Sequence, residues 1–217
     1  MSIYNLTFSP KIFTSPNTSL SKIISFIPPK SKKILDIGCS SGYLGQYIKQ
    51  KFNCSVDGID NNKDDLKIAN KYLDKVYCLD IEHDNLSVIK SKYDILIFAD
   101  ILEHTINPQS ILQKFKSKLT KNGIIIISVP NIIHQSIILN LLNRHWQYTD
   151  TGILDKTHLR FFDKTSITKL IKESGFKIQK IDFTIHPYPK INNIPLRVLL
   201  NKQEFKIFQY IIKAKSE

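Results

Sequence analysis

Between residues 33 and 130, short apolar runs alternate with amphipathic segments, and this alternation restricts the possible folds more than any other feature of the chain. Repeated strand–helix–strand units produce such a pattern, and they build a mostly parallel sheet with helices on its faces. Runs as solidly apolar as these are typical of strands buried on both faces. Strands are therefore expected at residues 33–38, 54–60, 75–80, 93–100 and 123–130.

The segments between these runs place apolar residues three or four positions apart, which is the spacing of helices that cover a sheet. Helices are expected at residues 43–52, 62–72 and 108–119. Asn107 followed by Pro108 marks a good helix start, because asparagine caps free backbone N–H groups and proline fits the first turn. The pattern as a whole predicts an α/β fold.

Residues 131–163 lack this rhythm, and we expect this segment to bind the substrate. It contains the only tryptophan of the chain, Trp146, together with Tyr148, Phe161 and Phe162. These rings could wall a substrate pocket, although the two phenylalanines are more typical of a core.

The two ends of the chain add further elements. A helix at residues 17–27, within an N-terminal segment of residues 1–31, is placed to act as a lid over the loop of the first strand. A helix is expected at residues 164–176, capped by Thr165 and ended by Gly175. A strand at residues 176–185 follows, then a loop marked by Pro187, Pro189 and Pro195, and a last strand at residues 208–215.

The length of 217 residues suits one domain, which we expect to span residues 1–217. The longest apolar stretch, at residues 123–130, is far shorter than the roughly 20 residues of a membrane-spanning helix, so no membrane partner is expected. Cys39, Cys54 and Cys78 lie in or beside apolar runs, which predicts buried thiols and a reducing, cytoplasmic location.

The formal net charge of +12 raises the question of nucleic-acid binding. Only Arg144, Arg160 and Arg197 are arginines among the 31 basic residues, and the lysines are spread along the chain. Arginine reads phosphates and bases better than lysine does, because its guanidinium is a bidentate fork. A small molecule is therefore the favoured partner, and nucleic acid is the less favoured one.

The loop after the first expected strand fits two different kinds of site. Residues 38–42 spell G-x-S-x-G, the turn that exposes a hydrolase serine, here Ser40. Such an enzyme needs an oxyanion loop on an earlier strand, and only a short, proline-broken segment precedes Ser40. A nucleotide site needs an acid about 20 residues later, at the end of the second strand, and Asp60 stands there. Ser40 is therefore predicted to be structural. A nicotinamide cofactor is disfavoured, because Tyr43 occupies the position of the third glycine of its motif.

The stretch from Asp36 to Gly42 resembles the first motif, acid-x-Gly-x-Gly-x-Gly, of the class I S-adenosylmethionine-dependent methyltransferases, with Ser40 at the middle glycine. FADILEH (98–104) resembles a motif of the group that includes the ubiquinone-biosynthesis O-methyltransferases. DKTHLRFFD (155–163) resembles a segment of bacterial small-molecule methyltransferases. The resemblance covers residues 33–215. It implies a Rossmann-like, doubly wound, seven-stranded sheet of order 3-2-1-4-5-7-6 with strand 7 antiparallel.

The resemblance also implies S-adenosyl-L-methionine as the cofactor and assigns residues to it. Asp36 and the loop would hold its amino acid end, Asp60 would accept the ribose hydroxyls, and Asp80 would accept from the adenine. The implied cofactor-binding residues are Asp36, Gly38, Cys39, Ser40, Gly42, Asp60, Asn61, Asp80, Ile81 and Ala99.

Methyl transfer to a hydroxyl needs a positioned oxygen and a proton acceptor, and histidine suits the second role. The candidates are His158, which Asp155 could orient, and His104. Each has a structural alternative, since His158 could brace its loop and His104 could cap the turn. The other four histidines have no supporting context and are expected at the surface or in loops: His83, His134, His145 and His186.

Asp100, Glu103 and His104, with the distant His158, resemble the ligand set of some metal-dependent O-methyltransferases. Metal-free relatives carry similar residues, so we leave a metal out of the predicted site. The sequence thus predicts a methyltransferase that acts on an oxygen of a small molecule, a sugar or a hydroxylated aromatic. An RNA 2′-O-methyltransferase and a catalytically silent, cofactor-binding partner subunit remain as alternatives.

Overall fold

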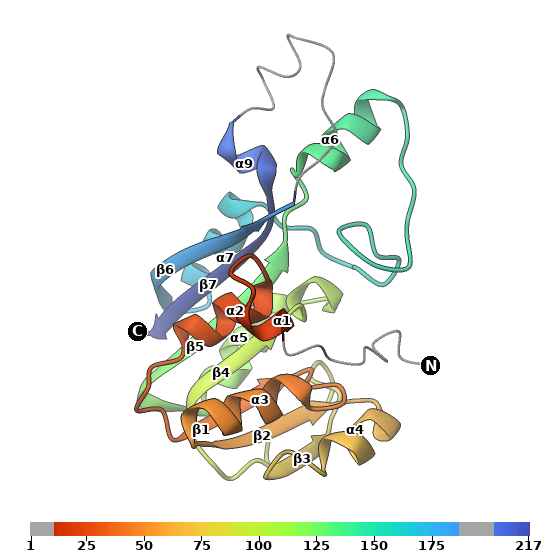
Figure 1. The fold of residues 1–217 in the computed structure, drawn as a ribbon. Coiled ribbons are helices and arrows are strands. Elements are labelled where there is room, and N and C mark those ends of the chain that lie inside the picture. Colours follow the sequence, from red (N-terminus) through yellow and green to blue (C-terminus); the bar gives the residue numbers. More distant parts are fainter. Residues whose placement is uncertain (1–10, 187–201) are drawn as a thin grey trace.

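The computed structural model describes residues 11–186 and 202–217, which form a seven-stranded sheet with helices on both faces (Figure 1). The strand order is β3-β2-β1-β4-β5-β7-β6. The strands are β1 (Lys33–Ile37), β2 (Ser55–Asp60), β3 (Lys75–Cys78), β4 (Tyr93–Ala99), β5 (Leu119–Pro130), β6 (Phe176–Ile185) and β7 (Ile207–Ser216). Strands β1 to β5 pair in parallel, and β7 is antiparallel to both β5 and β6. The predicted fold class, strand order and antiparallel seventh strand are confirmed.

Helices cover the two faces of the sheet and enclose a hydrophobic cluster on each. The helices are α1 (Lys11–Thr14), α2 (Ser19–Phe26), α3 (Tyr43–Phe52), α4 (Lys63–Ala69), α5 (Pro108–Lys116), α6 (Gln135–Leu142), α7 (Lys164–Glu173), α9 (Gln203–Lys206) and the 3-10 helix η1 (Leu102–His104). One cluster contains residues of α2, α3 and α4, and the other contains residues of α5 and α7. Along β1, Ile34 joins the first cluster and Leu35 the second, because successive strand residues point to opposite faces. Both faces of the strand are therefore buried, which is why Ile34, Leu35 and Ile37 are all apolar.

Two helix starts show how local chemistry sets the boundaries. Asn107 accepts a hydrogen bond from the Ser110 backbone at 3.0 Å, with Pro108 in the first turn, as predicted. For α7, the prediction of Thr165 as the cap is wrong. Asp163 is the cap, and it forms a reciprocal box with Ser166, whose hydroxyl bonds back to the Asp163 N–H. The reciprocal pair satisfies two backbone groups, whereas a threonine inside the first turn would satisfy neither.

Several boundaries differ from the expectation. Strand β5 begins at Leu119, four residues before the predicted start, and its pairing with β4 contains a register shift. The helix expected at residues 62–72 ends at Ala69. The short helices α1, α6 and α9 were not predicted. The loop marked by Pro187, Pro189 and Pro195 lies outside the described residues.

Cys39 and Cys54 are buried as expected, but Cys78 is exposed. Cys78 ends β3, the edge strand of the sheet, where fewer neighbours cover a side chain. None of the helices in the described ranges combines the length and the apolar character that a membrane span requires. Helix α2 packs against β5, β6 and β7, which are distant from it in the sequence (Figure 1). The N-terminal segment therefore lies on strands that come from the second half of the chain.

Candidate active site

The loop that follows β1 turns sharply at the carboxyl end of the sheet. The backbone N–H groups of Gly38 and Cys39 both donate to the carbonyl of Ile59, at 2.8 and 2.9 Å, which ties the loop to β2. Gly42 has a φ of +81°, and a Cβ there would lie 2.9 Å from the Cα of Ala69 in α4. Glycine is needed at this position for its backbone angle and for the close helix contact. Ser40 also has a positive φ, +46°, which costs a non-glycine residue roughly 1–2 kcal/mol.

Asp60, at the end of β2, holds this loop directly. Its carboxylate accepts from the Ser40 N–H at 2.8 Å and from the Asn62 N–H at 2.9 Å. These charge-assisted bonds fix the acid at the predicted position beside the loop. Each carboxylate oxygen can accept a further hydrogen bond, so the side chain can still bind hydroxyl groups of a ligand.

A cavity of about 710 Å³ opens over this loop, within the range of small-molecule and cofactor sites. Most of the residues predicted to bind the cofactor line it: Asp36, Gly38, Cys39, Ser40, Asp60, Asn61 and Ala99. Gly42, Asp80 and Ile81 are not on its wall. The structure therefore brings the loop and the ends of β1, β2 and β4 together around one space.

The Asp80 carboxylate is engaged by its own turn. It accepts from the Glu82 N–H at 2.8 Å and pairs with Nδ1 of His83 at 2.9 Å. The hydrogen bond with His83 lowers the pKa of Asp80, and the same contact raises the pKa of His83. His83 was expected to have no specific context, and this pairing is its context.

Asp36 lies at the floor of the cavity and is only 2% exposed. Burial, and to a smaller extent the nearby charge of Asp60, together raise the pKa of Asp36 to about 7. A buried carboxyl next to another acid favours a cationic ligand, because a positive charge would offset both effects.

The N-terminal segment supplies another wall of the cavity, with Ile12, Asn17, Thr18, Ser19 and Leu20. Three contacts fasten this segment: Asn17 hydrogen-bonds to Ile185, Lys22 pairs with Asp182 at 2.9 Å, and Phe13 stacks on Tyr47 at 4.3 Å between ring centroids.

His104 and His158, the predicted catalytic pair, lie in edge-to-face contact with their ring centroids 4.6 Å apart. Nδ1 of His158 lies 2.9 Å from the carbonyl oxygen of Ile153. Because a carbonyl oxygen only accepts, Nδ1 carries the proton, and neutral His158 keeps its lone pair on Nε2. The same bond braces the loop, which is the structural role considered for His158. His158 itself is not among the residues that line the cavity.

His104 is oriented by Thr157. Its Nδ1 lies 3.3 Å from the Thr157 carbonyl and 3.1 Å from the Thr157 hydroxyl, which itself donates to Asp155 at 2.7 Å. Asp155 therefore orients His104 through Thr157, rather than His158 as expected. Burial, followed by the charge of His158, lowers the pKa of His104, so its ring is neutral at pH 7.

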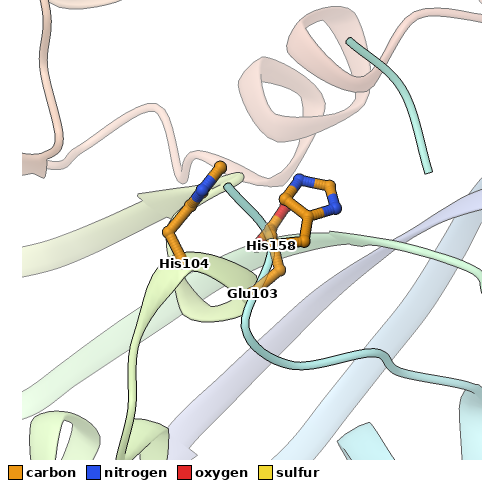
Figure 2. Close-up of side chains that lie close together, drawn as sticks. All are labelled: Glu103, His104 and His158. Carbon is orange, nitrogen blue, oxygen red and sulfur yellow. The ribbon is translucent and has the colours of Figure 1, made fainter. Parts of the chain in front are cut away.

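Glu103 completes a cluster with the two histidines (Figure 2). One potential ligand atom from each of the three side chains lies within 4.8 Å of the others. Glu103 is 1% exposed, and neither carboxylate oxygen has a hydrogen-bond partner among the described residues. Burial, and then the charge of Asp100, raises the pKa of Glu103 well above its usual value. The cluster thus contains a buried carboxyl group that either a proton or a bound cation would stabilise.

Asp100 is separate from this cluster, although the sequence pattern grouped it with Glu103 and the two histidines. Its φ is +55°, and its carboxylate accepts from the Ser128 hydroxyl at 3.0 Å and from the Gln209 side chain. Burial raises the pKa of Asp100.

The aromatic residues of segment 131–163 divide between surface and core. Trp146 and Tyr148 are 45% and 52% exposed and do not line the cavity. Phe162 is buried in the core, as the alternative expectation had it. His134 is only 2% exposed and caps α6. It lies in the loop before this helix, one of the two places expected for it, and is buried there rather than at the surface.

The cavity residues that the sequence did not assign to the site include Thr184, His186, Phe208 and Gln209. They come from the ends of β6 and β7, far along the chain from the motif loop. Antiparallel pairing sets Thr184 opposite Gln209, a register that no local pattern encodes.

Comparison with known proteins agrees with this arrangement. Residues 16–181 match a family model described as "Methyltransferase domain". The ubiquinone biosynthesis O-methyltransferase of Glaesserella parasuis is 30% identical over 162 residues, which cover 69% of this chain and 67% of that protein. The chain spans between about half and two thirds of the lengths of the first curated relatives.

Solved structures share the fold. A SAM-dependent methyltransferase from Archaeoglobus fulgidus superposes with a TM-score of 0.64 at 20% identity, over 91% of this chain and 92% of that one. The plantazolicin methyltransferase, solved in complex with S-adenosylhomocysteine (SAH), gives a TM-score of 0.61 at 16% identity, over 96% and 86%. With the motif loop, the acid at the end of β2 and the sheet order in place, the chain belongs to the S-adenosylmethionine-dependent methyltransferases.

Proposed function

We propose that this protein transfers the methyl group of S-adenosylmethionine to a hydroxyl oxygen of a small molecule. The observation that carries the proposal is one continuous cavity whose wall includes both the motif loop with Asp60 and the histidine His104. A cofactor held at the loop and a proton acceptor at the end of β4 would therefore face the same space. The names of the curated relatives, O-methyltransferases, favour oxygen as the accepting atom.

The residues around the loop fit this cofactor. Asp60 has spare acceptor capacity for ribose hydroxyls, and Asp36 is a buried acid suited to a cationic amino group. When bound, S-adenosylmethionine supplies an electrophilic methyl group on a sulfonium sulfur. The contacts of the N-terminal segment favour a lid role for it, because they join it to β6 while its residues 17–20 line the cavity.

The chain itself must orient the acceptor and remove its proton. Nε2 of His158 and Nε2 of His104 are both placed to take a proton, since hydrogen bonds hold each Nδ1 in the protonated form. His104 lines the cavity, and His158 packs against the ring of His104 without lining the cavity itself. The depressed pKa of His104 keeps that ring neutral and able to accept.

A divalent cation is a second way to use this cluster, and the unpartnered carboxylate of Glu103 favours it. Glu103, His104 and His158 would hold the ion. When bound, a divalent cation supplies positive charge that lowers the pKa of a substrate hydroxyl. Binding of Mn²⁺ to the purified protein, followed by electron paramagnetic resonance, tests this directly. Glu103→Gln should abolish stoichiometric Mn²⁺ binding. Glu173→Gln is the control, because Glu173 is an exposed helix residue, and it should bind Mn²⁺ as the parent does. If the parent protein binds no Mn²⁺, the proposed metal site is wrong.

The proposed activity is tested by incubating the protein with methyl-labelled S-adenosylmethionine and hydroxylated acceptors, first catechol and a simple methyl glycoside. A labelled methyl ether is the expected product. Its loss in His158→Asn, with retained SAH binding, would place the proton acceptor at this cluster. A protein that binds SAH and methylates no hydroxylated acceptor would instead support the silent partner subunit.

A further inference from the structure

The ends of β6 and β7 form one side of the cavity, and the motif loop assigns no role to the residues there. Thr184 and Gln209 lie opposite each other in these strands, and both face the cavity. Thr184 is 2% exposed and Gln209 is 9% exposed. The Thr184 hydroxyl has no hydrogen-bond partner among the described residues. A buried hydroxyl of this kind costs about 1–3 kcal/mol unless a ligand group satisfies it.

Two stacked rings stand beside these polar groups. His186 lies on Phe208 with ring centroids 4.0 Å apart and an interplanar angle of 9°. The edge of His134 packs against Phe208 at 5.5 Å, which holds the phenylalanine in place. Since His186 and Phe208 both line the cavity, this side offers a flat, largely apolar wall next to a hydroxyl.

The Gln209 side chain connects this wall to the end of β4. It donates to the carboxylate of Asp100, which also accepts from the Ser128 hydroxyl at 3.0 Å. Asp100 follows Ala99 directly and lines the same cavity as His104. A molecule on the β6–β7 wall would therefore lie next to the proposed proton acceptors.

The charged side chains that line the cavity are mostly acidic. Asp100, Asp150 and Asp155 line the cavity, and hydrogen bonds to Thr157 lower the pKa of Asp155, so it is ionised. Lys156 is the only lysine or arginine among the described lining residues, and Asp150 neutralises it at 2.7 Å. A phosphate group in the cavity would meet like charge, and the described lining residues offer it no unpaired lysine or arginine.

We infer that the β6–β7 end of the cavity, built by Thr184, His186, Phe208 and Gln209, is the acceptor subsite, and that it takes an uncharged, hydroxyl-bearing ring and excludes phosphorylated ones. This inference rests on the proposed function. The ring packs on the Phe208–His186 wall, and one of its hydroxyls bonds to Thr184. Aromatic diols and sugar rings share this chemistry. RNA does not, because its phosphates would enter a cavity lined mostly by acidic side chains.

Saturation-transfer NMR on the SAH-saturated protein tests the subsite with three probes: catechol, methyl glucoside and phenyl phosphate. Either catechol or methyl glucoside is expected to bind, and the probe that binds shows whether the ring is aromatic or a sugar. Phenyl phosphate is not expected to bind. Thr184→Val keeps the shape of the side chain and removes the hydroxyl. This variant should bind the ring with about tenfold lower affinity, which is the effect of losing one hydrogen bond. Thr168→Val, on α7 and away from the cavity, should leave ring binding unchanged.

SAH titration of the same proteins separates the two levels of the argument. If the parent protein does not bind SAH, the proposed function fails. If SAH binds equally to the parent and to Thr184→Val, the subsite is judged on the probes alone. Binding of phenyl phosphate, absence of binding by both uncharged rings, or unchanged ring affinity in Thr184→Val overturns the subsite.

Discussion

The side-chain amide of Asn17 hydrogen-bonds in both directions to the backbone of Ile185: Nδ2 donates to the carbonyl at 2.5 Å, and Oδ1 accepts from the N–H at 2.9 Å. The pair joins the N-terminal segment to the end of β6, and the Lys22–Asp182 ion pair at 2.9 Å joins the same two elements again. Because Asn17 and Thr18 also line the cavity, these contacts hold one of its walls in place.

Loosening this wall should shorten the residence of the cofactor. We expect Asn17→Ala combined with Lys22→Ala to release SAH about threefold faster or more, from the loss of contacts worth roughly 0.5–1.5 kcal/mol. Stopped-flow displacement of bound SAH measures this rate. Lys67→Ala is the matched control, since it removes an exposed Lys–Asp pair on α4. Identical release rates in the double variant and the parent would remove the lid role.

Asp36 should make stability and cofactor binding depend on pH in opposite directions. Its pKa is about 7 in the folded protein and 3.8 in the unfolded chain. The folded protein therefore holds an extra proton between these values, so the free energy of unfolding declines as pH rises through this window. A cationic amino group pairs with the ionised form, so SAH should bind more tightly as pH rises toward about 8.

Asp36→Asn removes this titration. We expect the variant to lose less stability than the parent between about pH 4 and 7 in urea unfolding. Its SAH affinity should change little with pH. Parallel pH profiles for the two proteins in both measurements would show that Asp36 does not titrate in this range.

His158→Asn separates catalysis from bracing. The asparagine amide can still donate to the Ile153 carbonyl, but it provides no nitrogen at the position of Nε2. If His158 accepts the proton, turnover should fall about 10²-fold or more while SAH affinity and melting temperature stay close to those of the parent. A variant that melts earlier yet keeps its turnover at saturating acceptor would assign His158 to the loop instead.

The sequence was informative where chemistry is local. The apolar runs predicted the parallel strands of the sheet interior because burial on both faces leaves few polar positions, as Ile34 and Leu35 show. The glycine turn and Asp60 were identified because the loop and the acid each follow a strand directly.

The sequence was less informative where long-range packing decides. Thr184 and Gln209 meet only through antiparallel pairing of distant strands. The link from Asp155 through Thr157 to His104 depends on how a loop without regular structure folds back onto η1. The Asp163 cap was missed because two polar residues, Asp163 and Thr165, compete for one helix start, and the partner Ser166 decides between them.

Ser40 should not react as a nucleophile. Its backbone N–H is bound to Asp60, and His104 and His158 hydrogen-bond to Thr157 and Ile153 rather than to Ser40. Without a base, a serine hydroxyl stays protonated and unreactive. A fluorophosphonate probe followed by intact-mass spectrometry should leave the protein unlabelled, and a covalent adduct on Ser40 would reopen the hydrolase interpretation.

The central claim, that the loop and Asp60 hold S-adenosylmethionine, is tested most directly by calorimetric titration of SAH into the parent protein and Asp60→Ala. The parent should bind SAH, and the variant should bind it more weakly by roughly 1.5–3 kcal/mol, the loss of charge-assisted hydrogen bonds. Asp74→Ala is the control, because Asp74 also accepts a backbone N–H, that of Val56 at 2.7 Å, and does not line the cavity. Its SAH affinity should equal that of the parent. No binding to the parent, or equal affinity in Asp60→Ala, would contradict the account.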